Sequence, residues 1–127
     1  MNVLLDTHVL FWWFSDASKL SKRAIAIMGD PDNTVLVSAA TAWELAIKTN
    51  LGKIDALPLV VELGRFVELE GFMELPIGIE RAARAGLLPA HHRDPFDRLL
   101  VAQAQSLHVP LLSADQVMDR YDIKRLW

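Results

Sequence analysis

The chain has 127 residues, which is enough to bury one hydrophobic core, so we expect a single domain over residues 1–127. Its 52% hydrophobic and 23% charged content argues against intrinsic disorder, and the absence of cysteine excludes disulfides and thiolate metal ligands. The net charge of −3 lacks the basic excess typical of nucleic-acid-binding proteins, so charge alone neither supports nor excludes an RNA substrate.

The N-terminus shows no signal peptide and no membrane span. Its longest apolar run covers residues 9–14, far fewer than the roughly 20 residues that a transmembrane helix needs. We therefore expect a soluble, cytoplasmic protein without membrane contact.

The first fifty residues predict two short strands, each followed by helices. Both strands are continuous apolar runs without a polar face, which is typical of buried strands in a parallel sheet. Ser21 and Ser38 are good helix N-caps. In chain order, the predicted elements are a strand at 3–5, helices at 7–14 and 21–28, a strand at 34–37 and a helix at 38–50.

The second part of the chain continues this alternation. Gly71 ends one predicted helix, and Pro95 lies just before another. In chain order, the predicted elements are a helix at 59–70, a weaker strand at 72–75, helices at 79–87 and 97–107, a strand at 109–112, a helical turn at 116–120 and an edge strand at 123–127. Strands that alternate with helices indicate an α/β fold, a three-layer α/β/α arrangement around a parallel sheet.

Four acidic residues stand at positions that solubility does not explain. Asp6 ends the first strand, Asp115 follows the strand at 109–112, Glu44 interrupts the apolar helix at 38–50, and Asp97 opens the helix at 97–107. Ligands of open parallel sheets bind beyond the carboxyl ends of the strands, so we expect all four side chains at that rim. Their mutual repulsion would then require a divalent cation, and oxygen ligands favour Mg²⁺ or Mn²⁺.

Each of these residues also has a purely structural interpretation. Asp6 and Asp115 could cap the helices that follow them, and Asp97 could interact with its own helix dipole. Glu44 could form an i,i+4 ion pair with Lys48 on a solvent-exposed helix face.

The neighbours of Glu44 on its helix favour the functional interpretation. Ala40, Trp43 and Ile47 predict an apolar stripe, with Glu44 at the edge of that stripe and not opposite it. We therefore predict that Glu44 faces the metal.

Two other groups of residues could indicate partners. His8, His91 and His92 match no usual zinc spacing, so we expect solvated or hydrogen-bonded histidines. The four aromatic residues at 11–14 cannot all face inward from one helix, so part of this cluster could contact a partner protein.

Five motifs follow one another along the chain: Leu4-Leu5-Asp6-Thr7-His8, Ser38-Ala39-Ala40-Thr41-Ala42-Trp43-Glu44, Leu51-Gly52-Lys53-Ile54, Asp94-Pro95-Phe96-Asp97-Arg98-Leu99-Leu100 and Ser113-Ala114-Asp115. They resemble the motifs of PIN-domain proteins, and within that superfamily those of VapC-type toxins of toxin–antitoxin systems. The likeness runs from residue 2 to residue 127.

The resemblance implies a PIN fold and a Mg²⁺- or Mn²⁺-dependent endoribonuclease that leaves 5′-phosphate and 3′-hydroxyl ends. It also implies inhibition by a small antitoxin and a homodimer. The positions that match the family's site are the acidic residues Asp6, Glu44, Asp97 and Asp115 and the hydroxyl residues Thr7 and Ser113, which would orient carboxylates or waters.

Other residues near these motifs leave choices open. Lys48 and Arg98 are candidate phosphate contacts. Asp94 lies close to Asp97, and Asp119 lies one helical turn beyond the last motif. We favour Asp97 over Asp94, because Pro95 holds Asp94 in an extended conformation.

Two other functions remain possible. A PIN scaffold that binds RNA or a protein without cutting would not need all four acidic positions. An aspartyl-phosphate phosphatase would need a second acid two residues after Asp6, where His8 stands. The RNA target, the number of metal ions and the identity of the antitoxin do not follow from the sequence.

Overall fold

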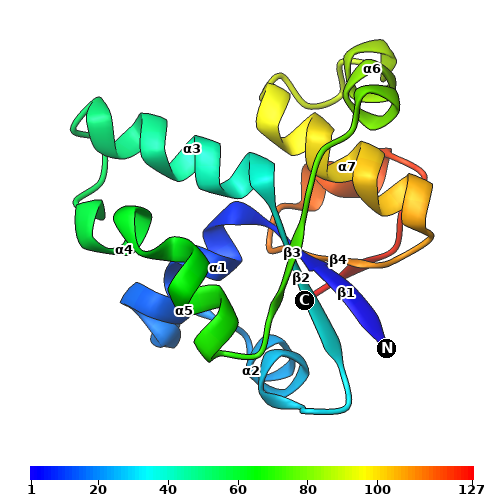
Figure 1. The fold of residues 1–127 in the computed structure, drawn as a ribbon. Helices are drawn as coiled ribbons and strands as arrows, with labels where there is room; N and C mark the ends of the chain where they lie inside the picture. The colour runs from blue at the N-terminus through cyan, green and yellow to red at the C-terminus, as the bar shows by residue number, and fades with distance from the viewer.

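A five-stranded, wholly parallel sheet forms the centre of the computed structural model, which describes residues 1–127 (Figure 1). The strand order is β3-β2-β1-β4-β5, with helices on both faces, so the predicted three-layer α/β/α fold is confirmed. The strands are β1 (Asn2–Leu5), β2 (Thr34–Ser38), β3 (Met73–Leu75), β4 (Leu111–Leu112) and β5 (Arg125–Leu126).

The strands alternate their side chains between two hydrophobic layers. Val3 of β1 is paired in register with Val35 of β2, and both face the layer that contains α1, α2 and α5. Leu4 is paired with Leu36 and with Leu111 of β4, and these face the layer that contains α7. These strands are buried on both faces, which explains why each appears in the sequence as an unbroken apolar run.

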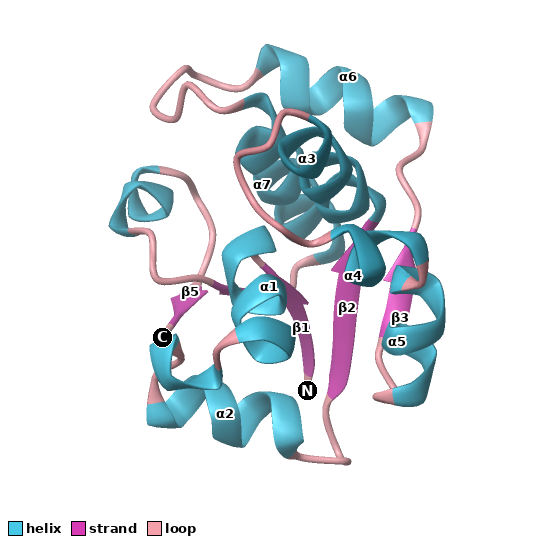
Figure 2. Cartoon of the chain, turned by 90° about the vertical axis from the view of Figure 1, so that its left-hand side faces the viewer, coloured by secondary structure: helices cyan, strands magenta, loops and turns pink.

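The helices are α1 (Thr7–Ser15), α2 (Lys22–Gly29), α3 (Ala39–Asn50), α4 (Leu57–Val61), α5 (Leu63–Leu69), α6 (Ile79–Leu87) and α7 (Pro95–Leu107). Two short 3-10 helices, η1 (Ala17–Lys19) and η2 (Gln116–Arg120), complete the chain. The carboxyl ends of β1, β2 and β3 point towards the side of the molecule that carries α3, α6 and α7, and α6 lies on the outer side of α7 (Figure 2).

The predicted helix at 59–70 is wrong in one respect, because two helices occupy this region. The break falls at Glu62, whose φ of −110° and ψ of 18° leave helical geometry. Pro58 opens α4 in its first turn, and the break allows α5 to bury Leu63 and Val67 while α4 buries no residue.

The predicted helix at 97–107 begins two residues earlier than expected. Pro95 is its first residue, because the fixed φ of proline suits the N-terminus of a helix. Asp94 is the N-cap, and its Oδ1 accepts a hydrogen bond from the Phe96 amide at 2.9 Å. The predicted strands at 109–112 and 123–127 are also shorter, since only the two residues of β4 and of β5 pair.

The aromatic run at 11–14 is half-buried throughout, as expected for a helix that cannot turn four rings inward. Trp12 packs on Trp127, and Trp13 on Phe72, with ring centroids about 6 Å apart. A role of this cluster in partner binding stays a prediction. None of the helices is both long and apolar enough to cross a membrane.

Candidate active site

The four predicted acidic residues come together at the carboxyl-end rim of the sheet. Asp6 directly follows β1, and Asp115 follows β4 by three residues. Glu44 projects from the second turn of α3, and Asp97 lies in the first turn of α7. Burial raises the pKa of Asp97, and the charges of Asp6, Glu44 and Asp115 raise it further, as expected for carboxylates gathered at one rim.

Asp6 is buried, with 3% of its surface exposed, and does not cap α1 with its side chain. The Ser113 hydroxyl donates to Asp6 Oδ2 at 2.6 Å, whereas Oδ1 is buried without a hydrogen-bond partner. Burial raises the pKa of Asp6, although the hydrogen bond from Ser113 opposes this effect. The capping interpretation of Asp6 is therefore wrong, and one of its carboxylate oxygens is left free.

Glu44 is the most deeply buried of the four carboxylates, with 1% of its surface exposed. The Lys48 ammonium donates to Oε2 at 2.6 Å, so the i,i+4 pair exists, but not on a solvent-exposed face. Oε1 is buried and has no partner. Although burial acts to lower the pKa of Lys48, the hydrogen bond and charge of Glu44 raise it overall, so the ammonium form is favoured.

The predicted apolar stripe beside Glu44 is wrong in one position. Trp43 is 60% exposed and contacts the ring of Phe96 edge-on, at 5.1 Å between centroids. The buried face of α3 consists of Ala40, Thr41, Glu44 and Leu45, so Glu44 lies within that face and not at its edge. The 3.6-residue period of the helix is compatible with either set of residues as the buried face. The packing of α3 against the sheet decides which set is buried.

Asp97 is 8% exposed, and its pKa is raised to about 8, first by burial and then by the charges of Asp6, Asp94, Glu44 and Asp115. Its neighbour Asp94 uses its carboxylate as the cap of α7. The structure therefore separates the two candidates that the sequence left open: Asp94 caps the helix, and Asp97 points into the acidic group.

Asp115 takes the capping role considered for it and also contacts His92 at the rim. Its Oδ1 caps η2 by accepting from the Val117 amide at 3.0 Å, and its Oδ2 lies 2.8 Å from His92 Nε2. Burial acts to raise the pKa of Asp115, but the hydrogen bonds from His92 and Val117 outweigh it, so the pKa lies below its ordinary value. The Ser113 hydroxyl accepts from the Asp115 amide at 3.0 Å and so connects it to Asp6.

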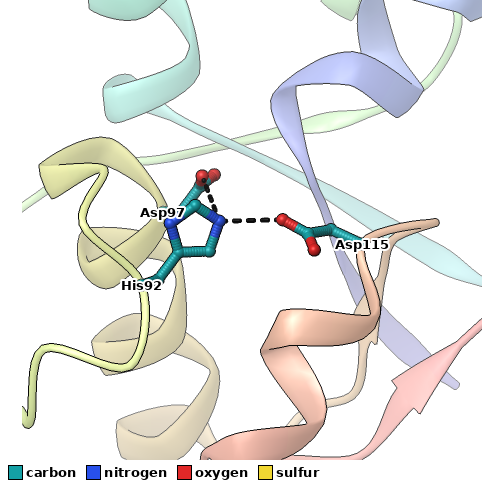
Figure 3. A group of neighbouring side chains, drawn as sticks. All are labelled: His92, Asp97 and Asp115. Atoms are coloured by element: carbon teal, nitrogen blue, oxygen red, sulfur yellow. Dashed lines mark hydrogen bonds and ion pairs between the residues drawn. The ribbon is translucent and has the colours of Figure 1, made fainter.

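His92 also belongs to the rim, although the sequence analysis did not include it among the site residues. Its Nε2 lies 2.8 Å from Asp115 Oδ2 and 3.0 Å from Asp97 Oδ2, so one imidazole joins two acidic residues (Figure 3). The expectation of a hydrogen-bonded histidine is met, but its partners are the candidate site itself. The signal in the sequence was the position of His92 five residues before Asp97, in a loop and not in a zinc motif.

The other candidate residues lie around this group. The Thr7 hydroxyl bonds the Thr41 hydroxyl at 3.0 Å and contacts no carboxylate. Arg98 Nε is buried without a partner. Asp119 is outside the group, because its carboxylate is exposed and bonds the guanidinium of Arg125 at 2.9 and 3.0 Å.

The donor set of the rim fits a hard divalent cation. The buried oxygens Asp6 Oδ1 and Glu44 Oε1 accept no hydrogen bond, and a buried polar atom without a partner is destabilising by about 1–3 kcal/mol. Asp97 and Asp115 add two more carboxylates, which lie close together on either side of His92 Nε2. Carboxylate oxygens are the ligands that Mg²⁺ and Mn²⁺ prefer.

A sequence model of the family described as PIN domain matches residues 3–124. The chain belongs to the PIN-domain family. It is 34% identical to Ribonuclease VapC22 of Mycobacterium tuberculosis over 106 residues, which cover 81% of this chain and 78% of that protein. The family resemblance seen in the sequence motifs is thus confirmed.

Solved structures of this fold superimpose on nearly the whole chain. One is VapBC2 from Rickettsia felis bound to a DNA fragment from the promoter, with a TM-score of 0.73, 14% identity, and 100% of this chain and 99% of that chain covered. Another is FitAcB from Neisseria gonorrhoeae, with a TM-score of 0.66, 20% identity, and 98% and 96% covered. At these identities the likeness supports the fold.

Proposed function

We propose that this PIN-domain protein is a metal-dependent endoribonuclease and the toxin of a toxin–antitoxin pair. The observation that carries the proposal is the group of four carboxylates at one rim, two of which keep a buried oxygen without a partner. The 34% identity to a ribonuclease supports the same reaction class.

In this proposal Asp6, Glu44 and Asp97 hold Mg²⁺ or Mn²⁺, and Asp115 completes the set. A divalent cation, when bound there, supplies an acidified water and charge neutralisation at the phosphate. Ser113 orients Asp6 through the 2.6 Å hydrogen bond. Products would carry 5′-phosphate and 3′-hydroxyl ends.

Two basic residues of the rim are suited to contact the phosphate backbone. Lys48 is part-exposed at the Glu44 carboxylate, and Arg98 keeps a buried Nε–H without an acceptor. The Thr7–Thr41 hydrogen bond ties α1 to α3, so Thr7 would act on the position of these helices and not on a carboxylate.

The proposed protein partner is a small antitoxin. VapBC and FitAcB structures superimpose on this chain, and the half-buried aromatic residues at 11–14 offer an apolar surface. A homodimer is also expected from the family resemblance.

The proposal is tested by RNA cleavage with Asp6→Asn, which keeps the shape of the side chain and removes its charge. We expect cleavage in Mn²⁺ to fall by at least about 100-fold, because Asp6 is a proposed ligand. Asp32→Asn, which changes an exposed aspartate in a turn, is the matched control and should leave cleavage unchanged.

The competing function is a PIN scaffold that binds without cutting. Wild-type protein that is neither stabilised by Mn²⁺ nor able to cut RNA would favour that function. Equal cleavage by wild type and Asp6→Asn would remove Asp6 from the site, and 5′-hydroxyl products would refute the assigned chemistry.

A further inference from the structure

We propose that His92 is a positioning residue of the rim: its ring donates to Asp115 and lies against Asp97, which fixes the spacing of these two carboxylates, and His92 is not itself a metal ligand. The inference rests on the proposed function, because it concerns how this chain presents the same site to its cation. It is carried by the contacts on both sides of the imidazole ring.

The backbone at His92 is anchored from a distant part of the chain. Tyr121, a buried residue at the end of η2, accepts a hydrogen bond from the His92 amide at 2.9 Å. The same hydroxyl donates to the Pro89 carbonyl at 2.7 Å. Both ends of the segment from Pro89 to His92 are therefore held against one side chain, although this segment has no helix or strand of its own.

The orientation and tautomer of the ring follow from a second backbone contact. The Asp94 amide donates to His92 Nδ1 at 3.2 Å, which requires a free lone pair on Nδ1. The ring proton therefore stands on Nε2. This nitrogen donates to Asp115 Oδ2 at 2.8 Å, and Asp97 Oδ2 lies 3.0 Å from the same nitrogen, within ion-pair distance.

The same contact argues against His92 as a ligand. A histidine that binds a metal through Nε2 carries its proton on Nδ1, and here that proton would face the amide N–H of Asp94. Two donors cannot satisfy one another. The arrangement instead leaves the unpartnered oxygens Asp6 Oδ1 and Glu44 Oε1 for the cation, while His92 contacts Asp97 and Asp115.

Direct detection of the tautomer tests this inference without any substitution. In protein labelled with ¹⁵N-histidine, the His92 ring, assigned with His92→Gln, should carry its proton on Nε2 both without metal and in saturating Mg²⁺. A proton that moves to Nδ1 when Mg²⁺ is added would make Nε2 the ligand and would overturn the proposal.

Calorimetric titration with Mn²⁺ alone gives an independent readout. His92→Gln places an amide N–H near the position of Nε2 and should retain an affinity close to that of wild type. His92→Leu fills the same space without a donor, and its affinity should fall by about 10- to 100-fold, the usual effect of losing a residue that orients metal ligands. His108→Asn, which changes an exposed histidine in the left-handed conformation that asparagine tolerates at the end of α7, is the control.

The variants also separate this inference from the proposed function. Equal Mn²⁺ affinity of His92→Leu and wild type would overturn the positioning role, even if both cut RNA. Loss of affinity in His92→Gln as large as in His92→Leu would assign the imidazole itself a role and would also overturn it. If the Mn²⁺ affinities are as expected but the wild-type protein does not cut RNA, the positioning role stands and the proposed nuclease function is refuted.

Discussion

Removing the charge of Asp97 is expected to stabilise the metal-free protein at alkaline pH. The pKa of this carboxyl group is raised from 3.8 to about 8 in the folded protein, first by burial and then by neighbouring carboxylates. The folded state therefore keeps a proton that the unfolded state has released. Stability is highest below about pH 4 for this group and falls as the pH rises towards about 8, where the folded state must also ionise.

The size of this effect follows from the same pKa. A difference of about 4 pKa units, at about 1.4 kcal/mol for each, corresponds to roughly 5 to 6 kcal/mol of stability lost above pH 8. Asparagine has the same shape and carries no charge. Asp97→Asn should therefore recover most of this loss at about pH 9, and its advantage over wild type should shrink to about 1–2 kcal/mol at about pH 5.

Urea unfolding in excess chelator, at several values between about pH 5 and pH 9, measures this difference directly. The raised pKa of Asp6 acts in the same direction, so Asp97→Asn should keep a weaker pH dependence of its own. Asp122→Asn, which changes an exposed carboxylate, should follow the wild-type curve. A wild-type protein whose stability rises from pH 5 to pH 8, or an Asp97→Asn variant no more stable at pH 9, would refute the reasoning.

Three further predictions concern the metal, the buried ion pair and the loop before α7. Mn²⁺ should raise the melting temperature more at about pH 8 than at about pH 6, because the cation competes with the proton on Asp97; equal increments in calorimetry would contradict this. Lys48→Met should lower the free energy of unfolding by about 1–3 kcal/mol, because it leaves Glu44 buried without its ammonium partner. Adding Glu44→Gln should restore part of that loss, and a double-mutant cycle without coupling would argue against the pair. Tyr121→Phe should destabilise by about 1–2 kcal/mol and speed hydrogen exchange at the His92 amide; unchanged exchange would show that the hydroxyl does not anchor the loop.

The sequence predicted the fold and the acidic rim because both depend on local features. Apolar runs without a polar face identify buried strands, and Asp6 and Asp115 could be placed at one edge from their positions after such runs. The helix break at Glu62 and the exposure of Trp43 were missed, since both are decided by how α3 and α5 pack on the sheet.

The role of His92 could not be predicted for a related reason. Its two main partners, Asp115 and Tyr121, lie 23 and 29 residues further along the chain, and no pattern of spacing encodes these contacts. The tautomer depends on a third contact, the amide of Asp94, which exists only when the loop is folded.

The hydrogen bond between Ser113 and Asp6 joins residues 107 positions apart, and the strand that delivers Ser113 inserts between the first strand and the last. A ribosome that has made only the first hundred residues therefore carries a polypeptide that cannot complete the rim. Under the proposed nuclease function, a nascent chain of this length holds an incomplete site, so RNA cleavage has to wait until β4 and Ser113 have been made.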